Sequence, residues 1–441
     1  MADMKRDVTG AKAAAITLSA ANTETKNDAL KAMADALDKR RDAVLKANAL
    51  DISFAEKMKD AGELTDAMVK RLKVNDDKIN GMIDGIRDVI KLKDPVGETM
   101  SAMELDDDLT LYQVRCPIGL IGVIFESRPD VVPQIMSLCL KSGNAVIFKG
   151  GKEASNTNKA LFDVLSEAAY ASGIPKGAFC LMETREDVSA ILEMDDYIDL
   201  LIPRGSNEFV KYIQSNTRIP VLGHSAGICH VYVDADADEN KALNVSLDSK
   251  IQYPAVCNAV ETLLINAKMA SSFIPKIVKL FNDNGVEVRA DARTIKIAGN
   301  AAEVTEAEAS DWDEEYNDMI ISVKIVDSLD DAIDFINKHS SKHTDSIVTE
   351  NKLNALRFVN LVDSSSVFVN ASTRFSDGFR YGKGAEVGIS TNKVHSRGPV
   401  GMEGLMIYKY ILLGNGHVVK DYAGKDAKRF KHRTLNKEFE M

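Results

Sequence analysis

The first ninety residues carry a helical pattern of apolar positions. Between about residues 20 and 90, apolar side chains recur at the spacing of one helix face, as at Leu30, Met33 and Leu37, with lysines and arginines between them. Such a stripe is typical of helices that cover a core. We therefore expect an N-terminal helical layer that has a packing role.

A strand pattern follows at residues 103–105 and 109–115, on either side of the acidic turn at residues 106–108. The alternation in LTLYQVR is that of a strand with one buried face. We expect a hairpin outside the main domains. Together with a strand near residues 405–412, it would pair with another subunit, because an unpaired ribbon favours association.

From residue 119 to residue 233, continuous apolar runs alternate with helical segments. The runs are GLIGVIF, NAVIFK, AFCLM, IDLLI and ICHVYV, and the longest helix between them covers about residues 156–170. Apolar strands separated by helices predict a parallel sheet that is covered on both faces. Sheets of this type bind ligands at the carboxyl ends of their strands.

A second stretch of the same kind follows, with strands at ETLLI, ISVKIV, SIVT and SVFVN. At 441 residues the chain is longer than one hydrophobic core usually supports, so we expect two or more domains. The pattern therefore predicts an α/β protein.

Charge and cysteine content narrow the possible functions. The net charge is −11, which disfavours a nucleic-acid partner. Five widely spaced cysteines without a C-x-x-C pair suggest neither a disulfide framework nor a metal site, and they fit a reducing compartment. No secretory signal opens the chain and no apolar run is long enough for a membrane span, so the sequence predicts a cytoplasmic protein.

Two glycine-containing turns are candidates for nucleotide binding, although no dinucleotide fingerprint opens a helix after a strand. In NAVIFKGGKEAS, Lys149 ends a strand and is followed by Gly150, Gly151 and Lys152. The alternative is a solvated turn. In PRGSNE, Gly205 and Ser206 open a helix, where a pyrophosphate could bind; ordinary helix capping is the alternative.

Cys257 is the sharpest candidate for chemistry. It lies in a short loop, in KIQYPAVCNAVETLLI, between a predicted helix at residues 243–250 and a strand at residues 261–265. A thiolate suits acyl chemistry because it forms thioesters and thiohemiacetals. The alternative is a small buried apolar residue, which is the role we expect for the other four cysteines.

Possible anion donors occur in two further segments. In IFESRPDVVPQ, Ser127 and Arg128 lie where a strand turns into a helix, and Arg128 could bind an acyl phosphate through its planar guanidinium. The alternative is a helix cap with a charge pair. His395 and Arg397, in HSRGP, are secondary candidates.

Several of these segments resemble one family. IFESRPDV, FKGGKEA, QYPAVCNA, NASTRFSDGFRYGKGAEVGIS and HSRGPVG are similar to the gamma-glutamyl phosphate reductase family of the aldehyde dehydrogenase superfamily, and the similarity reaches about residue 422. The resemblance implies an aldehyde dehydrogenase-like α/β fold. It divides the chain into a parallel-sheet cofactor domain (1–102 and 117–230), an α/β catalytic domain (231–398), a small β oligomerisation element (103–116 and 399–422) and a polar tail (423–441) that we expect to fray.

The resemblance also implies an activity, in which L-glutamyl 5-phosphate is reduced by NADPH to L-glutamate 5-semialdehyde with phosphate release, in proline biosynthesis. Cys257 would form the thioester and Ser127 would donate to the oxyanion. The implied cofactor contacts are Lys149 with the adenosine ribose, Gly205 and Ser206 with the pyrophosphate, and Glu315 with the nicotinamide ribose. A homo-oligomer and a separate glutamate 5-kinase as the source of substrate are implied as well.

Two departures from general aldehyde dehydrogenases are informative. Lys152 occupies the place of an acidic residue in the cofactor loop, which favours the 2′-phosphate of NADPH, although Glu153 lies next to it. The usual general-base glutamate corresponds to Val221 or Leu222 in VLGHSAG, so no carboxylate is there to activate water. The rival functions are a CoA-acylating aldehyde dehydrogenase and a non-catalytic binding or scaffold protein.

Overall fold

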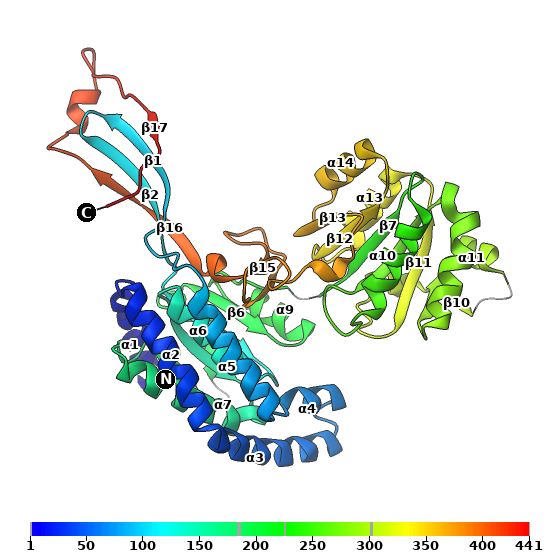
Figure 1. Cartoon of the computed structure of the whole chain (residues 1–441), viewed down its shortest axis with the longest axis horizontal. Coiled ribbons are helices and arrows are strands. Elements are labelled where there is room, and N and C mark those ends of the chain that lie inside the picture. The colour runs from blue at the N-terminus through cyan, green and yellow to red at the C-terminus, as the bar shows by residue number, and fades with distance from the viewer. Residues whose placement is uncertain (1, 183–186, 225, 300–302, 441) are drawn as a thin grey trace. The chain divides into compact units, whose positions relative to one another are not determined.

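The computed structural model describes residues 2–182, 187–224, 226–299 and 303–440, in two compact units (Figure 1). The first unit comprises Met1–Gly205, Tyr212–Val221 and Gly401–Met441. The second comprises Ser206–Lys211 and Leu222–Val400. Within these described residues, no helix has both the length and the apolar character that crossing a membrane requires.

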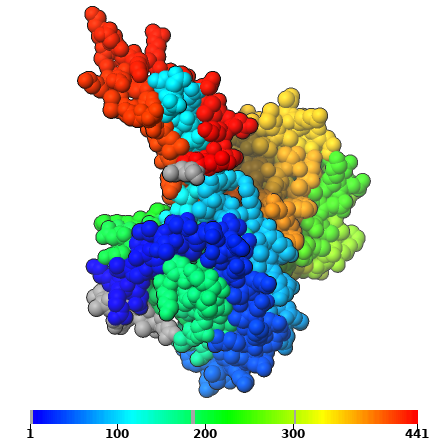
Figure 2. All heavy atoms as spheres, turned by 60° about the vertical axis from the view of Figure 1, so that its left-hand side comes forward, coloured from blue at the N-terminus to red at the C-terminus, as the bar shows by residue number. Residues whose placement is uncertain are grey.

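The N-terminal helical layer is confirmed. It consists of α1 (Ala2–Leu18), α2 (Thr23–Lys39), α3 (Arg41–Asp60), α4 (Asp66–Leu72) and α5 (Asp76–Lys91). Asn22, Thr65 and Asn75 cap α2, α4 and α5 with their side-chain oxygens. In the space-filling view these blue helices lie beside the green residues of α7 (Ser155–Ala171) in the first unit (Figure 2).

The first unit is built on a parallel sheet with the order β5-β4-β3-β6. Its elements are β3 (Leu120–Phe125), α6 (Val131–Lys141), β4 (Ala145–Gly150), α7, β5 (Phe179–Met182), α8 (Asp187–Leu192) and β6 (Leu200–Arg204). The next helix, α9 (Asn207–Ser215), begins in the second unit and ends in the first. Every residue of β3 is buried, as a strand in the middle of a sheet covered on both faces requires. The parallel sheet predicted from the apolar runs is therefore present.

A four-stranded antiparallel ribbon belongs to the same unit, with the order β16-β2-β1-β17. Its strands are β1 (Thr99–Asp106), β2 (Leu109–Pro117), β16 (Met406–Leu413) and β17 (Arg433–Leu435). The predicted hairpin and the strand near residues 405–412 are both found. The expectation that the tail frays is wrong for β17, which pairs with β1, while Phe439 packs edge-on against Tyr112 with ring centroids 5.5 Å apart. Figure 2 shows these orange and red C-terminal residues beside the cyan hairpin.

The second unit contains a seven-stranded parallel sheet with the order β10-β9-β11-β8-β7-β12-β13. The strands are β7 (Cys229–Val233), β8 (Val260–Asn266), β9 (Glu287–Ala290), β10 (Val304–Glu306), β11 (Ile320–Val326), β12 (Thr344–Val348) and β13 (Ser366–Val369). The helices are α10 (Glu239–Ile251), α11 (Ala267–Asp283), α12 (Ala292–Ala298), α13 (Leu329–His339) and α14 (Lys352–Leu361). A small antiparallel pair, β14 (Gly388–Ser390) and β15 (Gly398–Val400), follows.

One strand assignment needs correction. The run ICHVYV was counted with the first sheet, but β7 lies between β8 and β12 in the sheet of the second unit. A continuous apolar run identifies a buried strand without identifying the sheet that buries it.

Candidate active site

Three strand ends of the first unit bring the predicted cofactor residues together. Phe125, the last residue of β3, is in register with Gly150 of β4 and with Arg204 of β6. The loops after these strands are therefore neighbours at one edge of the sheet, where parallel sheets bind ligands. Lys149 is buried at this edge, and its Nζ donates to the carbonyl oxygen of Gly150 at 2.8 Å.

Gly150 and Gly151 each lie very close to a neighbouring side chain. A Cβ at Gly150 would lie 2.3 Å from Nδ2 of Asn158, and a Cβ at Gly151 would lie 2.2 Å from Oε1 of Glu153. Both distances are too short for a real Cβ, so a larger residue at either position would displace the buried side chain of Asn158 or Glu153. The turn is thus more than a solvated connection between a strand and a helix.

Ser127 and Glu153 bond to each other within the first unit. The Ser127 backbone N–H donates to Oε1 of Glu153 at 2.7 Å, and the Ser127 hydroxyl donates to the same oxygen at 3.0 Å. Ser127 has a φ of 49°, a conformation that L-residues rarely adopt, and both side chains are buried. Glu153 therefore holds the Ser127 turn. By contrast, Lys152 is half exposed and forms an ion pair with Glu63 at 3.0 Å.

The candidate anion donors differ in how strongly they are already bonded. The structure contains no hydrogen bond or ion pair of the partly buried Arg128 guanidinium to any described residue. Arg397, in contrast, bonds through Nη1 and Nη2 to the carboxylate and carbonyl oxygens of Asp363, each at 3.2 Å. His395 is exposed. Among the described residues, Arg128 therefore has no partner that an anion would have to displace, whereas Arg397 does.

Gly205 and Ser206 precede α9, as predicted. The Ser206 hydroxyl accepts from the Phe209 backbone N–H at 3.4 Å, so it acts as a helix cap. In the first turn of α9, the Asn207 amide donates to Oε2 of Glu315 at 2.8 Å. The turn of Ser206 and the predicted ribose ligand Glu315 are therefore neighbours in the second unit.

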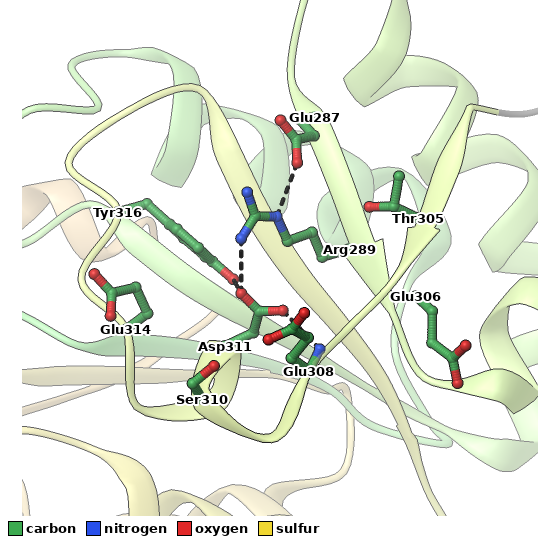
Figure 3. A pocket seen from close by; sticks show the side chains of 9 residues that line it. All are labelled: Glu287, Arg289, Thr305, Glu306, Glu308, Ser310, Asp311, Glu314 and Tyr316. Atoms are coloured by element: carbon green, nitrogen blue, oxygen red, sulfur yellow. Dashed lines mark hydrogen bonds and ion pairs between the residues drawn. The ribbon is translucent and has the colours of Figure 1, made fainter.

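A polar network supports the loop that carries Glu315. Arg289 donates to Glu287 and to Asp311, and the Tyr316 hydroxyl donates to Asp311, all at 2.8 Å (Figure 3). These groups line a cavity of about 530 Å³ whose walls carry five carboxyl groups and one guanidinium. Like charges repel an acyl phosphate from such a cavity, so we assign the network a supporting role.

Cys257 lies in the loop between α10 and β8, and its surroundings fix its backbone. Its carbonyl oxygen accepts from the buried Cys229 thiol at 3.2 Å, and the next residue, Asn258, donates to the Ser376 carbonyl at 2.9 Å. A Cβ at Gly227 would lie 2.2 Å from the Cys257 carbonyl oxygen, so only glycine fits there. The Cys257 side chain remains partly exposed. Burial raises the pKa of Cys229 well above its usual value, which leaves that thiol protonated.

Two histidines beside Cys257 were missed by the sequence analysis. A donor atom of His224, one of His343 and the Cys257 sulfur all lie within 4.8 Å of one another. His224 belongs to the VLGHSAG segment, in which the general-base carboxylate is missing. His343 lies in SSKHTD, where neither spacing nor motif indicates function. The sequence signal for His224 is an imidazole close to the missing carboxylate, where it could serve as a base instead.

Arg374 was also missed, although the NASTRF segment had been noted. Its buried guanidinium donates through Nε to Gln252 at 2.9 Å and lies close enough to Cys257 for an electrostatic interaction. Burial lowers the pKa of Arg374 from its usual value, but an arginine stays charged. A fixed positive charge therefore lies near the thiol.

A buried ion pair flanks the Cys257 loop in sequence. Lys250 at the end of α10 donates to Glu261 of β8 at 2.7 Å, and the two side chains are 0% and 1% exposed. Burial raises the pKa of Glu261 to about 8 and lowers the pKa of Lys250.

Comparisons with known proteins agree with this architecture. The model of the aldehyde dehydrogenase family matches residues 1–296. A gamma-glutamyl phosphate reductase of Methanosarcina mazei is 61% identical over 441 residues, with 99% of each chain covered. The crystal structure of gamma-glutamyl phosphate reductase from Thermotoga maritima has a TM-score of 0.90 at 42% identity, covering 94% of this chain and 99% of that one. The expected aldehyde dehydrogenase-like fold is confirmed.

Proposed function

Because this chain belongs to the aldehyde dehydrogenase family, and within it to the gamma-glutamyl phosphate reductases, we propose that it reduces L-glutamyl 5-phosphate to L-glutamate 5-semialdehyde with release of phosphate. The product would serve proline biosynthesis, and a separate glutamate 5-kinase would supply the substrate. The observation that carries the proposal is the Cys257 thiol, which is held in a fixed loop beside two imidazoles and an arginine.

The chemistry would proceed through Cys257. One of the two neighbouring imidazoles accepts the thiol proton, and the thiolate attacks the acyl carbon. Expulsion of phosphate leaves a thioester. Hydride addition to that thioester gives a thiohemiacetal, which collapses to the aldehyde and returns the thiol. The Cys257 backbone N–H and the Ser127 hydroxyl are the proposed oxyanion donors. Ser127 can donate to the substrate only after turning from Glu153.

A nicotinamide cofactor would supply the hydride when bound. We assign its adenosine side to the edge formed by Lys149, Gly150 and Lys152, and its pyrophosphate to Gly205 and Ser206. The buried Lys149 at a strand end and the α9 N-terminus that follows Ser206 fit an anionic dinucleotide. Glu315 would accept from the nicotinamide ribose, because its carboxylate is held by Asn207.

Cofactor choice would depend on Lys152. The neighbouring Glu153 is turned inward to Ser127, so its charge does not oppose a phosphate beside Lys152. The pair of Lys152 with Glu63 is exposed on both sides, and exposed pairs contribute little. Lys152 could therefore exchange Glu63 for the 2′-phosphate of NADPH. We propose a preference for NADPH over NADH.

Arg128 is the proposed ligand of the acyl phosphate, since its guanidinium has no partner among the described side chains. Arg374, near Cys257, is a second candidate that the structure adds. Arg397 and His395 remain proposals of lower rank, because Arg397 is already bonded to Asp363 and His395 is exposed.

The ribbon is the proposed site of self-association. β16 pairs with β2 on one side, and no other described strand pairs with its opposite side. This edge exposes large apolar side chains, among them Tyr408, Tyr410 and Leu412. An exposed apolar edge strand favours pairing with another chain. A homo-oligomer built through β16 and the β1–β2 hairpin would cover it.

The test is NADPH formation from L-glutamate 5-semialdehyde, phosphate and NADP⁺. We expect Cys257→Ala to abolish turnover while its thermal unfolding stays that of the wild type. Cys116→Ala, which removes a partly buried thiol in β2, is the matched control and should keep turnover. Near wild-type activity in Cys257→Ala would overturn the thioester mechanism. Turnover with CoA but without phosphate would favour the CoA-acylating rival, and no turnover with either would favour the non-catalytic one.

A further inference from the structure

His224, Cys257 and His343 present three soft or borderline ligand atoms to one small volume. The atoms lie within 4.8 Å of one another, and all three residues belong to the second unit. A tetrahedral zinc ion places a sulfur ligand about 2.3 Å away and nitrogen ligands about 2.0–2.1 Å away, which sets ligand atoms roughly 3.4–3.6 Å apart. The separations in the cluster exceed this spacing by about 1.4 Å at most.

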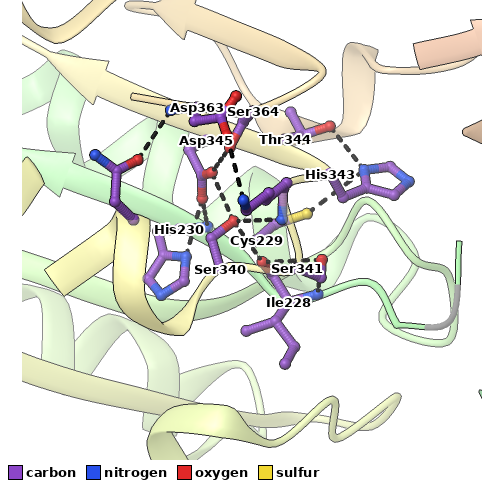
Figure 4. A network of polar contacts seen from close by, with 12 residues as sticks. Ile228, Cys229, His230, Ser340, Ser341, His343, Thr344, Asp345, Asp363 and Ser364 are labelled. Carbon is purple, nitrogen blue, oxygen red and sulfur yellow. Dashed lines mark hydrogen bonds and ion pairs between the residues drawn. The ribbon is translucent and has the colours of Figure 1, made fainter. Parts of the chain in front are cut away.

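Each of the two imidazoles has a polar partner at its Nδ1 atom. Nδ1 of His224 lies 2.9 Å from the Ile389 carbonyl oxygen, so this nitrogen must donate and the lone pair lies on Nε2. A metal-binding histidine usually donates the N–H of its other ring nitrogen to a carbonyl or carboxylate oxygen. Nδ1 of His343 lies 2.8 Å from the Thr344 hydroxyl (Figure 4).

The other ring nitrogen of His343, Nε2, has no hydrogen-bond partner among the described residues. This nitrogen is fully buried. A buried polar atom without a partner costs about 1–3 kcal/mol, so it calls for a ligand or a proton partner. Cys229 does not supply one, because its thiol faces Nδ1 of His343 at 3.8 Å (Figure 4).

The donor set selects the kind of ion. One thiolate and two neutral imidazoles suit zinc, whereas magnesium and calcium prefer oxygen ligands. Three protein ligands leave the fourth tetrahedral position for water, as in open zinc sites. Binding converts the Cys257 thiol to the thiolate and releases its proton to solvent.

We propose that His224, Cys257 and His343 form a binding site for a zinc ion, and that zinc held there reversibly blocks the enzyme by occupying the Cys257 sulfur. The binding stands on the cluster alone, whereas the block of turnover rests on the proposed function. A sulfur bound to zinc donates electron density to the metal and is crowded by it, so it is a much weaker nucleophile toward the acyl carbon than the free thiolate. The same ion would shield Cys257 from alkylation.

Cobalt titration of the chelator-treated protein tests the binding without any activity measurement. Co²⁺ substitutes for Zn²⁺ and reports tetrahedral geometry and sulfur ligation in its absorption spectrum. We expect one Co²⁺ per chain with a sulfur-to-cobalt band, displaced by one equivalent of Zn²⁺. Cys257→Ser should lose the sulfur band. His224→Asn and His343→Asn should each weaken binding by about tenfold or more, since even outer partners of metal ligands are worth 10–100-fold.

The matched control is His417→Asn, which removes a partly exposed histidine of the first unit and should leave the titration unchanged. His224→Asn provides a variant at a partly exposed position in case His343→Asn fails to fold. The site is refuted if wild-type protein binds no stoichiometric Co²⁺, or if the ligand variants bind as tightly as His417→Asn. Zn²⁺ should also stop turnover and iodoacetamide labelling of Cys257, with recovery on adding chelator. Stoichiometric binding with full turnover would overturn the inhibitory part alone.

Discussion

Removing one partner of the buried Lys250–Glu261 pair should destabilise the second unit strongly. In Lys250→Met the carboxyl group of Glu261 stays in the interior, 1% exposed, without the ammonium that lies 2.7 Å from it. Breaking a buried pair costs about 3–5 kcal/mol where an uncompensated charge remains, which here applies at a pH above the pKa of Glu261. For a domain of 150–250 residues this corresponds to a fall in Tm of roughly 6–20 °C, at about 2–4 °C per kcal/mol.

The loss should depend on pH in a defined direction. Burial raises the pKa of Glu261 to about 8, above its usual value of 4.5, so the folded state binds the proton more tightly than the unfolded chain. Stability from this group is fully present below the unfolded pKa and is lost as the pH rises through the folded pKa. Without Lys250 the carboxyl group is more strongly shifted in the same direction. The deficit of Lys250→Met should therefore be larger at pH 9 than at pH 6.

A double variant provides the control. Lys250→Met/Glu261→Gln removes both charges and keeps an oxygen acceptor and a similar volume at position 261. It should recover much of the loss, because replacing both members of a buried pair is often nearly neutral. The assay is thermal unfolding followed by fluorescence at both pH values. A Tm for Lys250→Met within about 2 °C of wild type, or equal deficits at the two pH values, would refute the reasoning.

Two further predictions concern the first unit. Lys152→Glu should shift preference from NADPH toward NADH by about tenfold in relative kcat/KM, since a charged contact to phosphate is worth roughly 1.5–3 kcal/mol and Lys152 is half exposed. The control is Lys159→Glu, at an exposed position of α7. An unchanged NADPH-to-NADH ratio in Lys152→Glu would mean that Lys152 does not contact the cofactor. Light scattering should show that the chain self-associates at micromolar concentration. Tyr410→Lys/Leu412→Lys on β16 should weaken the assembly, whereas the control Leu50→Lys on α3 should not. A monomeric wild-type chain would contradict this prediction.

Much of the fold followed from local apolar patterns. Buried strands such as β3 and β8 are short apolar runs with helical stretches between them, and both were identified. The sheet to which β7 belongs could not be read from its own residues, because strand order depends on packing over long sequence distances. The short strand β17 carries no apolar run, and only its pairing with β1 defines it.

The candidate site was predictable where one segment carries its chemistry. The Cys257 loop and the turn at Lys149 and Gly150 both stand out in the sequence. The inward turn of Glu153 toward Ser127 could not be predicted from the sequence, because it depends on two loops that meet only in the folded sheet. His343 was equally hidden, since it is 86 residues from Cys257 and adjoins it only after β7 and β12 have paired.

Phosphate dependence of aldehyde oxidation tests the proposed reductase most directly. No carboxylate occupies the general-base position at Val221 or Leu222, and general-base help typically contributes 10²–10⁴-fold to attack by water. Phosphate arrives already anionic and needs positioning, for which Arg128 is the proposed group. The measurement is NADPH formation from L-glutamate 5-semialdehyde and NADP⁺, with phosphate rigorously removed or added back. We predict that turnover requires phosphate and that Arg128→Ala weakens phosphate use while cofactor binding is kept. Sustained turnover to glutamate without phosphate would mean that His224 or His343 activates water instead, and it would contradict the proposed reductase.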